Sequence, residues 1–140
     1  MIPTNPDSII ALDVGEKRIG VAHADTTVRV PVVHSTIEVN GLEIERIRQI
    51  VAELQPMKIV VGYPRNQRGE PTAQTKEVKK FAHQLHELQV PVVYQDESLT
   101  SVLAEKYLKS QKKPYTKADI DGQAAAIILG DYLEEHFYGH

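Results

Sequence analysis

The chain has 140 residues, a length that fits a single domain over residues 1–140. With 41% hydrophobic and 25% charged residues, its composition argues against a disordered chain and against a membrane protein. The formal net charge is −3, from 16 basic and 19 acidic residues. This balance argues against a protein that holds nucleic acid by bulk positive charge, but it leaves room for a local basic face.

The first three elements in chain order are predicted strands. Short apolar runs over residues 8–13, 18–24 and 29–37 are joined by glycine-containing or polar turns, which is the pattern of an antiparallel meander. Residues 43–55 then switch to helical spacing, and Pro56 ends this helix.

The second half of the chain alternates strands with helices. Predicted strands cover residues 58–63 and 90–94, and a polar, turn-rich loop covers residues 64–72. The predicted helices lie at residues 73–89, about 100–110 and about 119–137. The order βββαβαβαα indicates an α/β fold, in which a mixed five-stranded sheet combines the antiparallel meander with parallel strands and is flanked by helices.

Cysteine is absent, which excludes disulfides and thiolate zinc sites. The N-terminal residues lack the charged and apolar regions of a secretory signal, and no run of 18 apolar residues is present. We therefore expect a cytoplasmic protein without a membrane partner.

Two predicted strand ends carry carboxylates. Asp13 ends the first strand, and Asp96 and Glu97 follow the fifth. A bare charge at the end of a buried strand is costly, so a cationic partner is expected there. The carboxyl ends of parallel strands line one edge of a sheet, so Asp13 and Glu97 are expected to converge. Neighbouring strand residues point to opposite faces, which removes Asp96 from the same site.

The last predicted helix supplies a third carboxylate. Asp119 and Asp121 are two residues apart and diverge on a helix. Asp119 suits a role as N-cap. Asp121 precedes the small pair Ala124–Ala125, which would let the helix approach the sheet closely. The predicted catalytic and metal-binding residues are therefore Asp13, Glu97 and Asp121.

Ligands that offer only oxygen select a hard cation, Mg²⁺ or Mn²⁺. We expect none of the three carboxylates to have a positive residue beside it. The three would then hold two ions about 3.5–4 Å apart, and these ions would clamp a scissile phosphate. The predicted chemistry is phosphodiester hydrolysis. Two simpler interpretations stay open. The acids could be solvated surface residues, or Lys17–Arg18 could pair with Asp13 in the absence of any metal.

Basic residues near the predicted site are expected to contact backbone phosphates. Lys17–Arg18 follow the turn after the first strand, and Arg65 and Arg68 lie in the polar loop. Tyr63 and Tyr115 are candidates for stacking on a base in a single-stranded region.

Four segments resemble the YqgF family, described as Holliday junction resolvases or pre-16S rRNA nucleases. They are ALDVGEKRIGVA at 11–22, VGYPRN at 61–66, DESLTS at 96–101 and DGQAA at 121–125. The resemblance implies an RNase H-like fold with divalent metal at the site. It places the family's acidic residues on Asp13, Glu97 and Asp121, and it adds Asn66 to the expected nucleic-acid contacts.

The resemblance also implies a role in maturing the 5′ end of 16S rRNA in the bacterial cytoplasm, with branched DNA as the alternative substrate. Pre-rRNA or branched DNA would then be the partner, together with ribosomal precursor particles. The protein itself is expected to be a monomer or a weak homodimer.

Two positions depart from the family pattern. Ser98 stands where the family usually has arginine, and Arg65 follows the loop proline where the family is usually more apolar. An actin-like ATPase is an alternative, because such enzymes also carry Asp-x-Gly at a hairpin tip, as at Asp13–Gly15. It would need two lobes to enclose a nucleotide, which 140 residues do not supply. A non-catalytic RNA-binding module of the same fold is the remaining alternative.

Overall fold

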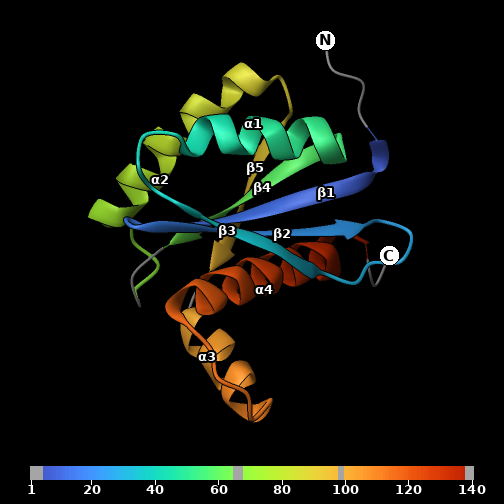
Figure 1. Ribbon diagram of the computed structural model, residues 1–140. Helices are drawn as coiled ribbons and strands as arrows, with labels where there is room; N and C mark the ends of the chain where they lie inside the picture. The colour runs from blue at the N-terminus through green and yellow to red at the C-terminus, as the bar shows by residue number, and fades with distance from the viewer. Residues whose placement is uncertain (1–4, 65–67, 98–99, 138–140) are drawn as a thin grey trace.

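The computed structural model describes residues 5–64, 68–97 and 100–137 (Figure 1). The strands are β1 (Asn5–Val14), β2 (Arg18–Asp25), β3 (Val32–Glu38), β4 (Pro56–Pro64) and β5 (Val92–Glu97). The helices are α1 (Glu43–Leu54), α2 (Ala73–Gln84), α3 (Thr100–Ser110) and α4 (Lys117–Phe137), with a 3₁₀ turn, η1 (Leu85–Leu88), after α2.

The strands form one sheet in the order β3-β2-β1-β4-β5. β2 runs antiparallel to both β1 and β3, whereas β4 and β5 run parallel to β1. The predicted meander, the parallel strands and the order βββαβαβαα are all confirmed. Because β1, β4 and β5 are parallel, their carboxyl ends lie at the same edge of the sheet.

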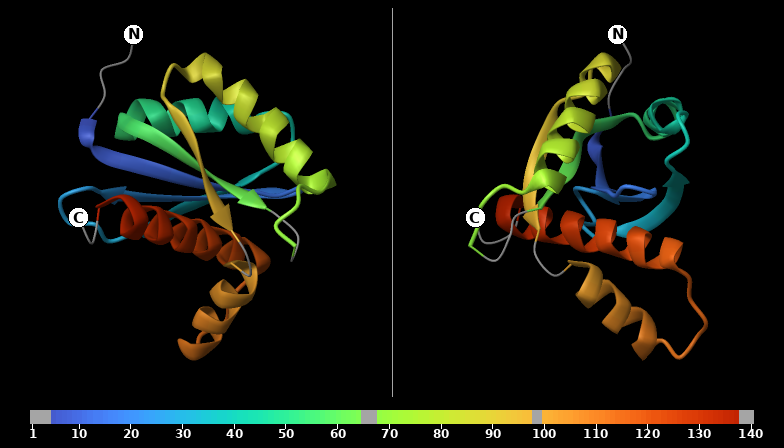
Figure 2. Two further views of the ribbon diagram at one scale, coloured as in Figure 1. Left: turned by 180° about the vertical axis from the view of Figure 1, so that it is seen from behind. Right: turned by 90° about the vertical axis from the view of Figure 1, so that its left-hand side faces the viewer.

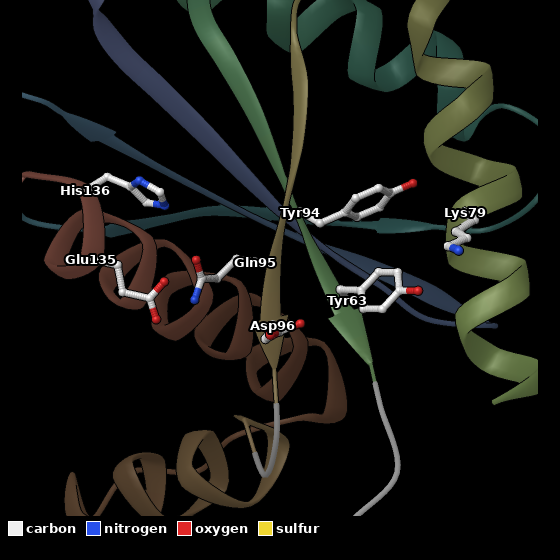
Figure 3. Close-up of a pocket in the computed structure, with 7 residues that line it drawn as sticks. All are labelled: Tyr63, Lys79, Tyr94, Gln95, Asp96, Glu135 and His136. Carbon is white, nitrogen blue, oxygen red and sulfur yellow. The ribbon is translucent and has the colours of Figure 1, made fainter. Parts of the chain in front are cut away.

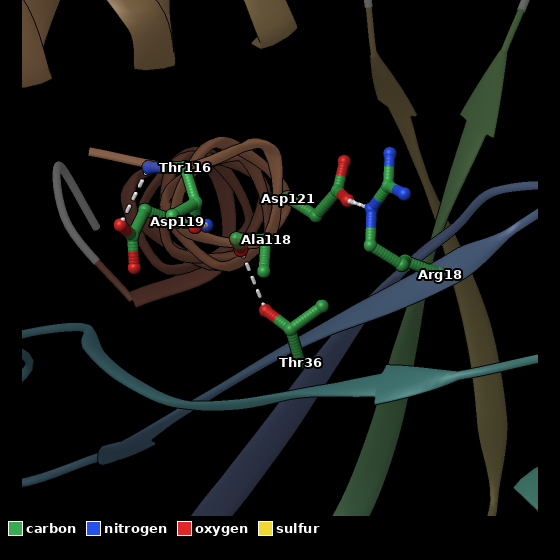
Figure 4. A network of polar contacts seen from close by, with 6 residues as sticks. All are labelled: Arg18, Thr36, Thr116, Ala118, Asp119 and Asp121. Carbon is green, nitrogen blue, oxygen red and sulfur yellow. Dashed lines mark hydrogen bonds and ion pairs between the residues drawn. The ribbon is translucent and has the colours of Figure 1, made fainter.

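Helix α4 begins at Lys117, earlier than predicted, and Asp119 is not its N-cap. The Thr116 hydroxyl accepts a hydrogen bond from the Asp119 backbone N–H at 3.2 Å, and Asp119 Oδ2 accepts one from the Thr116 N–H at 2.9 Å. This is a capping box with Thr116 at the cap. Asp119 is the reciprocal member of the pair and points away from the sheet (Figure 4).

Alternation along β1 divides the core into two layers. Ile10 and Leu12 belong to the layer covered by α1 and α2, whereas Ile9 and Ala11 belong to the layer covered by α4. Figures 1 and 2 show α1 and α2 on one side of the sheet and α4 on the other, with α3 packed on α4 away from the sheet. Within the described residues, no helix has the length and apolar character needed to cross a membrane.

The start of α4 lies very close to the sheet because glycine leaves room for it. A Cβ on Gly20 of β2 would lie 1.9 Å from the carbonyl oxygen of Asp121. A Cβ on Gly122 would lie 2.7 Å from Val33 Cγ1. The Thr36 hydroxyl fastens the same turn by donating to the Ala118 carbonyl at 2.7 Å (Figure 4). The close approach rests on these two glycines as well as on the expected Ala124–Ala125 pair, which is fully buried.

Candidate active site

Asp13 lies near the carboxyl end of β1, on the face covered by α4. It follows Ala11 by two residues, and Ala11 packs in the α4 layer. Its cross-strand partner on β2 is Gly20. Because the Asp121 carbonyl sits directly over Gly20, the fold brings the α4 backbone at Asp121 against the part of the sheet that carries Asp13.

Glu97 is the last residue of β5 and approaches from the other side. A Cβ on Gly62 of β4 would lie 2.8 Å from Glu97 Oε2 and 2.6 Å from Ile128 Cδ1 on α4. The Glu97 carboxylate therefore occupies space on the α4 face that any larger residue at position 62 would fill. Asp96 alternates with Glu97 on the strand and faces the other way, as predicted.

Glu97 and Asp121 are close enough to Asp13 to perturb its ionisation. Burial, followed by repulsion from Glu97 and Asp121, raises the pKa of the Asp13 carboxyl to about 8. Burial also raises the pKa of Glu97, although the Thr100 hydroxyl opposes this by donating to Glu97 Oε2 at 3.2 Å. The protein thus concentrates negative charge where ionisation is unfavourable, which is typical of functional sites.

Arg18 is the cation beside this group. Its Nε donates to Asp121 Oδ2 at 2.6 Å, and both side chains are about three-quarters buried (Figure 4). The expectation that no positive residue lies beside the carboxylates is therefore wrong for Asp121. The ion pair also differs from the simpler interpretation, in which Lys17–Arg18 would pair with Asp13.

The donor chemistry of the site fits a hard divalent cation, because Asp13, Glu97 and Asp121 offer carboxylate oxygens only. A bound cation would offset the burial of the Asp13 carboxylate and its repulsion by Glu97 and Asp121, the causes that raise the pKa of Asp13. As the side chains lie, no group of three His, Asp or Glu residues within the described part of the chain is arranged to hold a metal ion. Asp121 is engaged by Arg18 instead.

The expected nucleic-acid contacts are only partly described. Lys17 is exposed in the β1–β2 turn and Arg68 is exposed before α2, whereas Arg18 is the partner of Asp121. Arg65 and Asn66 lie outside the described residues, as does Ser98.

The two tyrosines expected to stack on bases both have protein partners. Tyr63 is 8% exposed and packs against Tyr94, with the ring centroids 5.1 Å apart. The Tyr115 hydroxyl donates to Glu105 Oε2 at 2.9 Å. Tyr63 is therefore too buried to stack on a base as predicted. Tyr94, which the sequence pattern did not single out, is 43% exposed.

Three residues of the site were not predicted as such. Thr100 contacts Glu97, while Gly20 and Gly62 make room for the Asp121 backbone and for Glu97. A glycine inside a strand often marks a place where another segment approaches closely, so the sequence does contain a signal for Gly20 and Gly62. Thr100 lies within the DESLTS segment but carries no sign of its own that it contacts Glu97.

Comparison with solved structures places the fold. RuvC from Thermus thermophilus in complex with a Holliday junction substrate matches with a TM-score of 0.56 at 12% identity, over 91% of this chain and 94% of that chain. Fowlpox virus resolvase in complex with Holliday junction DNA matches with a TM-score of 0.54 at 13% identity, over 91% and 97%. The RNase H-like fold expected from the sequence is confirmed.

Comparison with sequences identifies the family. Residues 7–135 match the family model described as "RuvX: Holliday junction resolvase". A protein of Rippkaea orientalis, named "Putative pre-16S rRNA nuclease", is 44% identical over 91% of this chain and 95% of its own length. A protein of Chloroflexus aurantiacus with the same name is 44% identical over 93% and 88%.

The fold and the matching family define the class of this protein as a nuclease, an enzyme that hydrolyses phosphodiester bonds. The chain belongs to the RuvX family. This confirms the family resemblance that the four sequence segments carry.

Proposed function

We propose that this protein is a divalent-metal-dependent nuclease that matures the 5′ end of the 16S rRNA precursor in the bacterial cytoplasm. The observation that carries the proposal is the convergence of Asp13, Glu97 and Asp121 at one edge of an RNase H-like sheet. Bacterial relatives named as pre-16S rRNA nucleases at 44% identity support the choice of substrate.

In this proposal, Asp13, Glu97 and Asp121 hold two Mg²⁺ or Mn²⁺ ions. Bound ions of this kind lower the pKa of an attacking water and stabilise the leaving oxygen. The chain's own residues prepare the site. Thr100 orients Glu97 through its hydroxyl, and Gly62 leaves the space that the carboxylate occupies.

Arg18 has two roles in this proposal. Its Nε keeps Asp121 at the site, and its remaining guanidinium nitrogens can donate to a substrate phosphate. Lys17 and Arg68 are exposed and extend the phosphate contacts, together with Arg65 and Asn66 of the same loop. Ribosomal precursor particles would present the substrate, so a partner larger than naked RNA is part of the proposal.

Cleavage of four-way DNA is the second candidate function. The description of the family model favours it, and so does the fold shared with two resolvases whose structures contain Holliday junction DNA. The chemistry at the carboxylates would be the same, and the two proposals differ in the nucleic acid that is cut, a precursor rRNA or a four-way DNA junction.

The test compares cleavage by the wild type, Asp13→Asn and Glu97→Gln. Each protein is given a 16S rRNA precursor fragment and a four-way DNA junction, with Mg²⁺, Mn²⁺ or a chelator. We expect precursor cleavage by the wild type with either metal, and a loss of at least about 100-fold for both variants, because carboxylate ligands act as a unit.

Asp119→Asn is the matched control, because it removes the same charge two residues from Asp121, at an exposed position in the capping box. It should cleave like the wild type. Cleavage that survives Asp13→Asn, Glu97→Gln or the chelator would overturn metal-dependent hydrolysis. Cleavage of the DNA junction alone would favour the second function, and loss of all cleavage with binding retained would indicate an RNA-binding module.

A further inference from the structure

A pocket of about 530 Å³ lies at the free edge of the sheet, beside the candidate active site. β5 is the edge strand here, and the pocket walls come from β4, β5, α2 and the last turns of α4. Figure 3 shows Tyr63, Tyr94 and Lys79 on one side of β5 and Glu135 and His136 on the other. The pocket thus extends around the edge of β5, with two tyrosines and a lysine on one side and a glutamate and a histidine on the other.

The β4–α2 side of this pocket combines an accessible aromatic ring with a cation. Tyr94 is 43% exposed, although it lies within a strand. The buried ring of Tyr63 supports it edge-to-face, with centroids 5.1 Å apart. The exposed Lys79 places its Nζ 5.5 Å from the centroid of the Tyr63 ring. The exposed Tyr94 ring and the Lys79 ammonium group lie on the same side of β5, with the Tyr63 ring contacting both (Figure 3).

The backbone around these side chains is fixed. The Thr75 hydroxyl donates to the carbonyl of Pro64, the residue after Tyr63, and Thr72 caps the same end of α2. Lys79 lies four residues after Thr75 and so on the same side of the helix. These bonds tie the start of α2 to the end of β4, and they hold Lys79 beside the two tyrosines.

The charges of the residues that line the pocket determine how a ligand with a phosphate would be oriented in it. Glu135 contributes a carboxylate on the other side of β5 from Lys79, and Asp96 contributes one at the end of the strand, on the same side as Tyr94 (Figure 3). A phosphate would be repelled by these two groups and attracted by Lys79. A ligand with a flat ring and one phosphate would therefore place the ring against Tyr94 and the phosphate at Lys79. That combination describes a nucleotide.

The pocket and Glu97 adjoin at the end of β5, on opposite faces of the sheet. Asp96 lines the pocket, while the next residue, Glu97, faces α4 and the candidate active site. Tyr94 and Glu97 are three residues apart, roughly 10 Å along a strand. We propose that Tyr94 and Lys79 bind one unpaired nucleotide of a single-stranded RNA segment that flanks the bond to be cut, an inference that rests on the proposed function. Bases in a duplex are stacked on one another and cannot offer a face to Tyr94.

The test measures binding without cleavage. A short unstructured RNA with one 2-aminopurine is titrated with wild type, Tyr94→Ala, Tyr94→Phe and Lys79→Ala in chelator, and a blunt RNA duplex serves as the second ligand. Loss of one base–aromatic stack weakens binding by about 1–3 kcal/mol, so Tyr94→Ala should bind the single strand roughly 5- to 150-fold more weakly. Tyr94→Phe keeps the ring and should bind within about twofold of wild type.

Two further readouts separate contact from a general structural effect. Quenching of 2-aminopurine should disappear with Tyr94→Ala and return with Tyr94→Phe. Lys79→Ala should lower the slope of log K against log salt by about 0.7, the value for one phosphate contact on a single strand. Duplex binding should stay unchanged in all three variants.

Tyr107→Ala and Lys80→Ala are the matched controls, because Tyr107 is 49% exposed on α3 and Lys80 is the exposed neighbour of Lys79. The inference is overturned if Tyr94→Ala weakens single-strand binding no more than Tyr107→Ala does. It is also overturned if single strand and duplex weaken equally. RNA binding that is unaffected by Tyr94→Ala also overturns the inference, and would favour an extended peptide pairing with the edge strand β5 instead.

The failure of this inference can be distinguished from the failure of the proposed function. Single-strand binding that depends on Tyr94, combined with no cleavage of precursor rRNA by the wild type, supports the pocket and overturns the nuclease assignment on that substrate. Cleavage of precursor rRNA together with RNA binding that does not depend on Tyr94 supports the nuclease assignment and overturns the inference about the pocket.

Discussion

The two faces of the sheet are filled by different kinds of side chain. The face under α1 and α2 is made of large aliphatic residues, among them Ile10, Leu12, Ile19, Ile59 and Val61. Under α4, the strands instead present small residues around the site: Ala11, Gly20, Ala22 and Gly62. One face maximises buried apolar area, and the other lets a helix carry Asp121 against the sheet.

This difference separates stability from function. Large aliphatic side chains give most of the hydrophobic stabilisation, at about 1.5–3 kcal/mol each. Small residues give little, but they allow the close approach that brings Asp121 and Glu97 toward Asp13. Substitutions on the two faces should therefore have different signatures.

The largest effect is expected for Gly20→Ala. A methyl group at this position would lie 1.9 Å from the Asp121 carbonyl, so α4 must move away from β2. Overpacking against backbone should cost more than about 3 kcal/mol and should remove cleavage by displacing Asp121. Urea unfolding and single-turnover cleavage measure the two effects. Wild-type stability together with wild-type activity would contradict the close approach.

Val51→Ala gives the matching change on the other face. Val51 is fully buried on α1, and the loss of two methyl groups and the cavity left behind should cost about 2–3 kcal/mol. The folded fraction should keep wild-type kcat, because the site lies on the other face of the sheet, which α4 covers. A kcat that falls in proportion to stability would show that the two faces are not independent.

Asp13→Asn should stabilise the metal-free protein while it abolishes cleavage. The Asp13 pKa is about 8 in the folded protein against an ordinary value of 3.8, so the stabilising contribution of its protonated form is fully present below pH 3.8 and is lost as the pH rises through 8. At pH 8 in chelator, the variant should be more stable by at least about 1 kcal/mol, the equivalent of one pKa unit. Thermal unfolding from pH 5 to pH 8 tests this, since the advantage must grow with pH.

The smallest effect is expected for Thr36→Val, which removes the hydrogen bond to the Ala118 carbonyl. The loss should be about 0.5–1.5 kcal/mol, the usual net value of one hydrogen bond. Because this bond positions the start of α4, cleavage should fall by a few-fold while RNA binding is retained. Thr36→Ser keeps the hydroxyl and should restore both quantities, and no recovery would mean that the hydroxyl is not the cause.

The sequence predicts the framework of this molecule well, because alternation and helical spacing report burial directly. The same alternation separates Glu97 from Asp96, and both strand-end acids lie where parallel strands place them. Contacts between distant segments are not encoded in any local pattern. The ion pair of Arg18 with Asp121 joins residues 103 positions apart, and the support of Tyr94 by Tyr63 depends on β4 and β5 being neighbours. The prediction of Asp119 as the N-cap of α4 is wrong because Thr116 and Asp119 both suit a helix start, and Thr116 takes the cap position.

Titration of the metal-free protein with Mn²⁺, followed by calorimetry, tests the central claim most directly. Wild type and Asp119→Asn should bind with the same affinity, and Asp13→Asn should lose measurable binding, since Asp13 is the carboxylate on which the other two converge. Equal Mn²⁺ binding by wild type and Asp13→Asn would contradict a metal site built from Asp13, Glu97 and Asp121.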